Sequence, residues 1–296
     1  VDRFYSGCWV AMDMGGSRMK ILSSSYSKRL LTMAGIADEL EAQGFAEFDF
    51  SALMNRKTKR SFDAFQRRIC SSLPVDDYDV TGTRFRRFAR YLHFTGTGEL
   101  VRWALKRDEN GSPITGYSQS GQYHPDPEIA DVERIFPSLS EREGNNSAVH
   151  QIIQMCAEIG VMANILHPDG LLMVGTHWVR LSASEPGVLA AASPNKLHRD
   201  GEVITFGILL KRQNCVGGGN LIAVPEAAGK RPDQLKPGEK IRWLQLSQPF
   251  EAWVIDDRKI SHHVEEIALG PDGTTAERDI LLIDFLPQAS KLSDDL

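Results

Sequence analysis

Residues 194–225 read PNKLHRDGEVITFGILLKRQNCVGGGNLIAVP. The tetrapeptide HRDG at 198–201 leads into an apolar, β-branched segment at 203–210, which predicts a strand. Residues i and i+2 of a strand point to the same face, so we expect His198 and Asp200 to present an imidazole and a carboxylate side by side. Such a pair, completed by a distant histidine, forms a 2-His-1-carboxylate site for Fe(II).

The His-x-Asp pattern alone is a weak signal, because the chain contains it three times among eight histidines. The pairs at residues 124–126 and 167–169 both carry proline at the middle position. Proline cannot donate to a strand ladder, and it biases the preceding residue toward turn geometry. Sequence context therefore favours His198 and Asp200 as the metal ligands.

The third ligand should come from a later strand, and only His262 and His263 lie downstream. They follow an apolar segment at residues 252–255. Adjacent residues of a strand face opposite ways, so only one of the two can reach the metal. The pattern of residues leaves the choice open.

Fe(II) sites with open positions usually need a co-substrate. If this is 2-oxoglutarate, its distal carboxylate requires a cation inside the barrel. Arg278 heads the apolar strand expected at residues 278–286, and the planar fork of arginine suits a carboxylate. An exposed charge at a strand end is the alternative interpretation of Arg278.

Three glycines, residues 217–219, separate the strand at 203–210 from a second apolar segment at 221–224. A glycine-rich loop that binds phosphate opens a helix, whereas this one lies between two expected strands. We therefore interpret it as a hairpin turn.

Composition narrows the class of protein. A chain of 296 residues with 42% hydrophobic and 25% charged residues is typical of a soluble globular protein. The net charge of −5 disfavours a nucleic-acid partner, so we expect the basic run RFRRFAR at 84–90 to be a strand with a solvated basic face and a buried aromatic face.

No apolar run is long enough for a membrane span, and the start lacks a signal-peptide pattern. Four widely separated cysteines favour reduced thiols and a cytoplasmic location.

Short apolar segments separated by Gly, Pro and Asp recur through the second half of the chain, which predicts an antiparallel barrel or a two-sheet jelly roll. The expected organisation is a peripheral arm or non-native segment at 1–28, an N-terminal helical support at 29–80, a jelly-roll domain at 81–288 containing a helix at 141–165, and a tail at 289–296. Within the support, a short strand is expected at residues 45–50.

The chain resembles the Fe(II)/2-oxoglutarate-dependent amino acid hydroxylases, the family that includes the bacterial L-isoleucine dioxygenase. The resemblance covers about residues 80–287 and rests on the order and spacing of several segments. These are TRFRRF (83–88), QSGQYH (119–124), RIFP (134–137), HWVRL (177–181), HRDG (198–201), RQN (212–214) with glycines 217–218, DDR (256–258) with His262, and RDIL (278–281).

The resemblance implies a mostly β fold with flanking helices, the double-stranded β-helix or jelly roll. It implies that His198, Asp200 and His262 bind Fe(II) and that Arg278 binds 2-oxoglutarate. The implied reaction consumes O2 and hydroxylates an unactivated C–H bond of a free L-amino acid, proteinogenic or cyclic like pipecolate or proline, while 2-oxoglutarate becomes succinate and CO2. Asp200 fills the position that related halogenases leave for a halide.

Two alternatives remain: desaturation, epimerisation or sulfoxidation with the same cofactors, or a non-catalytic metal-binding β-barrel that serves as a binding module. The expected partner is a small-molecule amino acid, with no nucleic acid and no membrane, and the oligomeric state is open, a homodimer being one option.

Candidate substrate residues are Arg180, Arg258 and Arg86 for a carboxylate and Glu202 for an amine. The chain departs from the family at His263, where glycine is usual, at residues 265–266, where Thr-Pro is usual, and at Glu202, where His is frequent. The resemblance therefore leaves the substrate open.

Overall fold

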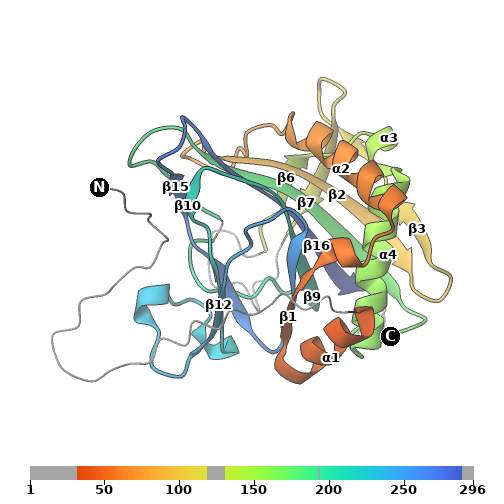
Figure 1. The fold of residues 1–296 in the computed structure, drawn as a ribbon. Helices are drawn as coiled ribbons and strands as arrows, with labels where there is room; N and C mark the ends of the chain where they lie inside the picture. The colour runs from red at the N-terminus through yellow and green to blue at the C-terminus, as the bar shows by residue number, and fades with distance from the viewer. Residues whose placement is uncertain (1–31, 119–130, 193, 289–296) are drawn as a thin grey trace.

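The computed structural model describes residues 32–118, 131–192 and 194–288, and its largest element is a seven-stranded antiparallel sheet (Figure 1). The strand order is β1-β13-β9-β16-β7-β2-β3. The strands are β1 (Phe45–Asp49), β2 (Arg84–Phe94), β3 (Glu99–Arg102), β7 (Leu171–Ala183), β9 (Ile204–Gln213), β13 (Glu251–Asp256) and β16 (Ala276–Pro287). The first seven residues of β9 are all buried, because both faces of the central strands are covered.

Three-stranded sheets complete the β structure. They are β10-β15-β8, β12-β11-β14 and β4-β5-β6, formed by β4 (Lys106–Arg107), β5 (Pro113–Tyr117), β6 (Arg134–Pro137), β8 (Leu189–Ala190), β10 (Cys215–Gly217), β11 (Asn220–Ala223), β12 (Lys240–Leu244), β14 (Ser261–Val264) and β15 (Ile267–Leu269). Ile222 of β11 and Leu244 of β12 share one buried cluster with Trp253 and Ile280 of the large sheet. Two antiparallel layers thus enclose a core, and the predicted jelly roll is confirmed.

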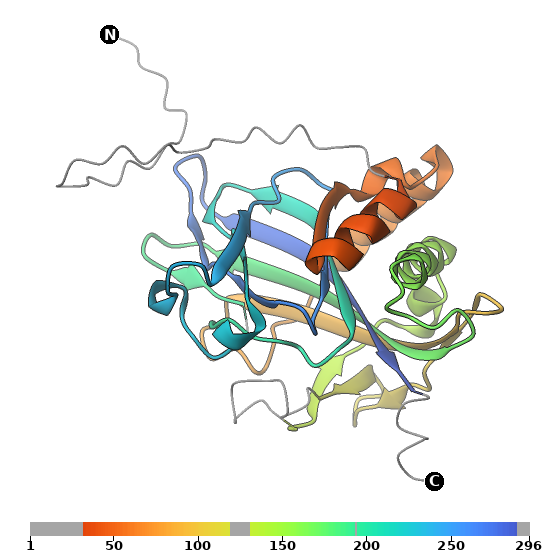
Figure 2. The same ribbon diagram turned by 90° about the horizontal axis from the view of Figure 1, so that it is seen from below.

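Helices cover the other face of the large sheet, away from the smaller sheets (Figure 2). They are α1 (Met33–Gln43), α2 (Arg56–Cys70) and α4 (Ser147–Met162). Phe62 and Phe65 of α2 lie with their ring centroids 6.1 and 5.6 Å from that of Trp178 in β7. Because Trp178 faces the helices, its neighbour His177 faces the interior of the jelly roll.

The helix predicted at residues 141–165 is interrupted. α3 (Glu141–Gly144) ends before α4 begins at Ser147. Asn146 caps α4 by accepting a hydrogen bond from the backbone N–H of Ala148 at 2.9 Å. An asparagine pair at 145–146 competes with helical hydrogen bonding and starts a new helix.

Two local predictions are wrong. The glycines at 217–219 do not form a hairpin, because β9 pairs with β13 and β16 whereas β11 pairs with β12 and β14. The glycines instead connect β10 of one three-stranded sheet to β11 of another. Arg84 and Arg86 are not on a solvated face either, since they are only 5% and 8% exposed and point inward from β2.

Several predicted segments lie outside the described residues: the arm at 1–28, the tail at 289–296 and the His-x-Asp pair at 124–126. Within the predicted helical support, β1 adds an edge strand to the large sheet by pairing with β13. Among the helices of the described residues, none combines the length and apolar character that crossing a bilayer requires.

Candidate active site

Three possible metal ligands converge where the HRDG segment meets β14. Asp200 Oδ1 lies 3.4 Å from His198 Nε2, and Asp200 Oδ2 lies 3.5 Å from His262 Nε2. One ligand atom from each residue lies within 4.8 Å of the other two, and no other group in the described part of the chain does this. Two imidazoles and one carboxylate match the chemistry of a facial Fe(II) site.

The local backbone explains this convergence. His198 and His262 exchange backbone hydrogen bonds of 2.9 Å as an isolated bridge, so His198 is not in the continuous strand that we expected. Gly201 then turns the chain into β9 at φ 84°, which favours glycine, and its N–H donates to Asp257 Oδ2 at 2.8 Å. The turn and this hydrogen bond fix the position of Asp200.

Hydrogen bonds and nearby charges orient the candidate ligands and set their protonation. The Nδ1–H of His198 donates to the carbonyl of Lys196 at 2.9 Å, which directs Nε2 toward Asp200 and makes Nε2 the atom that would bind a metal in place of its proton. Burial raises the pKa of the Asp200 carboxyl, but the charge of His262 and the hydrogen bond from His198 outweigh burial and hold this pKa well below its usual value. Asp200 is therefore a carboxylate.

The structure places His262, and not His263, beside the other two ligands. His262 lines the same cavity as His198 and Asp200, whereas His263 lies on the opposite face of β14 and lines an outer groove with Val216. The alternation of side chains along β14 separates the two histidines.

Mutating a residue that only positions a metal ligand typically weakens metal binding by roughly 10- to 100-fold. We predict that His262→Gln, which removes a ligand itself, weakens Fe(II) binding by at least this factor. His263→Gln should leave the Kd for Fe(II) within about twofold of the wild-type value. Calorimetric titration with Fe(II) under nitrogen measures both. The reverse order of the two variants would make His263 the distal ligand.

Arg278 lies on the inner face of β16 and is 2% exposed. In the described structure its Nε and Nη2 atoms have no hydrogen-bond partner. Burial and the nearby Arg212 lower its pKa to about 10, so the guanidinium keeps its charge at neutral pH. A buried cation with unsatisfied donors fits the distal carboxylate of 2-oxoglutarate.

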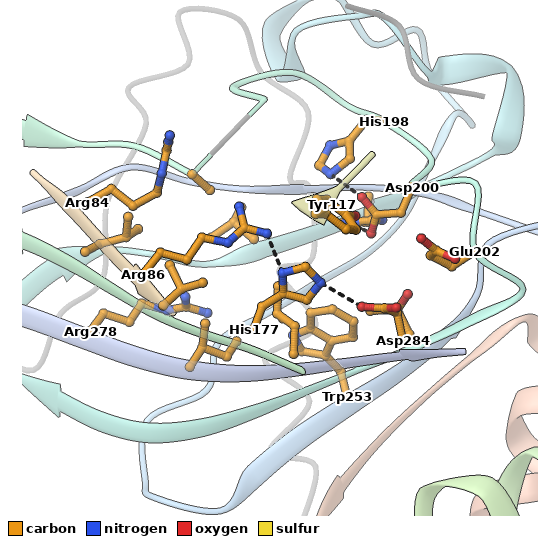
Figure 3. A pocket seen from close by; sticks show the side chains of 18 of the residues that line it. Arg84, Arg86, Tyr117, His177, His198, Asp200, Glu202, Trp253, Arg278 and Asp284 are labelled. Carbon is orange, nitrogen blue, oxygen red and sulfur yellow. Dashed lines mark hydrogen bonds and ion pairs between the residues drawn. The ribbon is translucent and has the colours of Figure 1, made fainter. Parts of the chain in front are cut away.

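One cavity connects Arg278 to the metal ligands (Figure 3). Alternating residues of β16 and β7 and the inner face of β2 supply most of its charged lining. The charged and aromatic lining residues include Arg84, Arg86, Tyr117, Arg134, His177, His198, Asp200, Glu202, Trp253, His262, Arg278 and Asp284. Two buried pairs that include residues of this lining were not anticipated from the sequence.

The first pair is Arg84 with Asp76. The Nε–H of Arg84 donates to Asp76 Oδ2 at 2.6 Å, and the Asp76 side chain is fully buried. This ion pair satisfies Arg84, which therefore shapes the wall of the cavity without offering its charge to a ligand.

We predict that Asp76→Asn lowers the free energy of unfolding by about 3 kcal/mol, because it leaves the buried Arg84 unpaired. Asp233→Asn breaks an exposed pair with Arg231 and should cost less than about 1 kcal/mol. Urea denaturation measures both. Equal losses in the two variants would refute a special role for the buried pair.

The second pair is His177 with Asp284, which the sequence analysis missed. His177 Nε2 donates to Asp284 Oδ2 at 2.8 Å, and His177 Nδ1 is hydrogen-bonded to Arg86 Nη2. Burial and the charge of Arg86 lower the pKa of His177 to about 4, so the ring is neutral at pH 7. The sequence did contain a signal for this pair. Asp284 lies six positions, an even number, after Arg278 in the apolar strand β16, so both side chains are expected on the same face.

Four residues were predicted to bind the substrate. Glu202 and Arg86 line the cavity, whereas Arg180 and Arg258 do not. Arg180 lies on the helix side of β7, where its Nε and Nη2 bind Asp279 at 2.7 and 2.8 Å. Arg258 is paired with Asp256 at the surface. Both arginines are therefore committed to structural ion pairs outside the cavity.

Acidic groups are crowded around the candidate metal ligands. Burial, Asp284 and Asp200 raise the pKa of Glu202 well above its usual value. Burial and Asp200 raise that of Asp257 to about 7. Such crowding of carboxyl groups is relieved by a bound cation, so the surroundings of the ligands also fit a divalent metal.

The chain is similar in sequence and fold to known proteins. The family described as 2OG-Fe dioxygenase matches residues 67–284. L-isoleucine-4-hydroxylase from Bacillus thuringiensis is 27% identical over 255 residues, which are 86% of this chain and 95% of that protein. The crystal structure of IDO from Bacillus thuringiensis matches with a TM-score of 0.66 at 23% identity, over 94% of this chain and 100% of that one. A bsmA homolog from Methylobium petroleophilum PM1 matches with a TM-score of 0.70 at 19% identity, over 87% and 94% of the two chains.

Proposed function

Because the chain belongs to the 2OG-Fe dioxygenase family, we propose that this oxidoreductase hydroxylates an unactivated C–H bond of a free L-amino acid. The observation that carries the proposal is that His198, Asp200 and His262 meet in a buried cavity that Arg278 also lines. An amino acid as the substrate class is supported by the relative named L-isoleucine-4-hydroxylase.

In this proposal, His198, Asp200 and His262 hold Fe(II), and Arg278 holds the distal carboxylate of 2-oxoglutarate. When bound, these groups supply O2-dependent oxidation of a C–H bond, coupled to conversion of 2-oxoglutarate to succinate and CO2. The protein binds and orients the substrate and excludes water. Val179, Ile280 and Leu282 line the cavity and provide an apolar wall beside the charged residues.

A screen of succinate release tests the proposal. The holoenzyme is incubated with Fe(II), 2-oxoglutarate and one amino acid at a time, both proteinogenic and cyclic, and product mass is measured. We expect at least one amino acid that contains no sulfur to stimulate succinate release and to gain the mass of one oxygen atom, because sulfoxidation would add the same mass to methionine or cysteine. Loss of two hydrogens, or no mass change, would instead indicate desaturation or epimerisation. No stimulation by any amino acid would refute the proposed function.

A further inference from the structure

Charged residues remain in the cavity after the iron ligands and Arg278 have been assigned. Figure 3 shows that they are sorted by sign: Arg84, Arg86 and Arg278 lie on one side, and Glu202 and Asp284 lie on the other. Arg84 is satisfied by its ion pair with Asp76. Among the remaining lining residues, Arg86 and Glu202 are a basic and an acidic group whose roles are unexplained.

Arg86 is a buried cation without an acidic partner among the described residues. Its guanidinium carbon lies 4.2 Å from the ring centroid of Phe136 and 5.5 Å from that of Tyr117, and its Nε has no hydrogen-bond partner. The nearby positive charge of Arg134 adds repulsion. A buried cation in such surroundings is costly unless an anion binds to it, and the cavity is the direction from which an anion can come.

His177 and Asp284 fix the direction in which Arg86 points. Asp284 Oδ1 accepts the backbone N–H of Gly175 at 3.2 Å, while Oδ2 accepts from His177 Nε2 at 2.8 Å (Figure 3). With its proton on Nε2, His177 accepts from Arg86 through Nδ1. His177 also stacks on Phe88, with ring centroids 4.3 Å apart, so the imidazole is held on both its edge and its face.

Glu202 provides an acidic group on the other side of the cavity (Figure 3). It is 9% exposed and lines the cavity with Asp284, and no described cation forms an ion pair with it. Its carboxyl group is thus a site for a cation other than the metal, such as an ammonium group.

Building on the proposed function, we propose that Arg86 binds the α-carboxylate of the substrate and Glu202 binds its α-ammonium group, with His177 and Asp284 as positioning residues for Arg86. The cavity thereby selects a zwitterion: both the free amine and the free acid are required. Arg278 remains reserved for 2-oxoglutarate, so the two carboxylates in the cavity have separate arginines.

The test combines protein variants with altered ligands. Holoenzyme loaded with Fe(II) and 2-oxoglutarate under nitrogen is titrated calorimetrically with the best amino acid from the screen, its primary amide and its N-acetyl derivative. For wild type, we expect each derivative to bind roughly 100-fold more weakly, because each leaves one buried charge unpaired. Arg86→Met should weaken binding of the free amino acid by a similar factor but add no penalty for the amide. Glu202→Gln should likewise weaken binding of the free amino acid by a similar factor but add no penalty for the N-acetyl derivative.

Arg87→Met is the matched control, because Arg87 is adjacent on β2 but points away from the cavity to Glu143 and Ser72. It should bind all three ligands as wild type does. For the positioning role, His177→Leu should raise the Kd for the amino acid, while His177→Asn, which restores an acceptor near Nδ1, should recover part of the affinity. The Kd for 2-oxoglutarate should change little in either variant. An unchanged Kd would show that the cavity is still folded.

The outcomes are distinguishable. If no amino acid is accepted in the screen, the proposed function fails and this inference fails with it. If an amino acid is accepted but its amide and N-acetyl derivatives bind equally well, the proposed function stands and the inference is overturned. The inference is also overturned if Arg86→Met retains wild-type affinity or shows the full penalty for the amide.

Discussion

Asp200→Asn is expected to reduce succinate release to below about 1% of the wild-type rate and to weaken Fe(II) binding beyond the roughly 10- to 100-fold cost of losing an outer-shell partner. Asparagine has nearly the same shape, but it lacks the negative charge that lies between His198 Nε2 and His262 Nε2. Without this charge the site offers the metal two neutral imidazoles and a weak amide oxygen. Calorimetry with Fe(II) under nitrogen and a succinate assay measure the two effects.

Asp169→Asn is the matched control for this variant. Asp169 belongs to another His-x-Asp pair, lies on an exposed turn, and is not part of the group of possible metal ligands found among the described residues. We expect wild-type Fe(II) affinity and activity. If Asp200→Asn bound Fe(II) as tightly as wild type, Asp200 could not be a ligand, whatever its position.

The sequence sufficed to single out His198 and Asp200, and to narrow the third position to His262 or His263, because these choices depend on local rules. Proline removed the competing His-x-Asp pairs, and alternation along a strand allowed only one of two adjacent histidines to face the metal. The choice between them required β14 to be placed against β11, where Ile222 is the register partner of His262. That register is a long-range property, so the sequence left it open.

The charged lining of the cavity was harder to predict. In RFRRFAR, arginines and aromatic residues occur on both faces of the strand, so local patterning does not say which face is buried. Burial of Arg84 and Arg86 depends on Asp76 and His177, and His177 is 91 residues from Arg86 in the chain. The prediction that Arg180 binds the substrate failed for the same reason. Only the fold shows that the face of β7 that carries Arg180 meets the helices and not the cavity.

The hairpin prediction failed for a related reason. Consecutive glycines allow positive φ angles, and Gly217 and Gly218 do adopt φ values of 77° and 74°. They therefore mark a sharp change of direction. Whether the following strand returns beside β9 or joins another sheet depends on the competing partners β12 and β14, which lie later in the chain.

Arg278→Met is expected to raise the Kd for 2-oxoglutarate by roughly 100-fold, because the variant removes the buried cation that we propose binds its distal carboxylate. The Kd for Fe(II) should change little, since Arg278 is not one of the three residues that converge as ligands. Arg278→Lys should fall between wild type and Arg278→Met, because lysine keeps the charge but not the planar fork. Calorimetric titration under nitrogen separates these constants.

The stability of the protein without ligands provides an independent test. A structural arginine is stabilising, but Arg278 is buried with two unpaired nitrogens and is repelled by Arg212. Arg278→Met should therefore leave the free energy of unfolding unchanged or raise it. Arg180→Met is the contrasting control: it leaves the buried Asp279 without its partner, so it should lower the unfolding free energy while 2-oxoglutarate binding persists. If Arg278→Met instead destabilised the protein and spared 2-oxoglutarate binding, Arg278 would be structural and the anchor would have to lie elsewhere in the cavity.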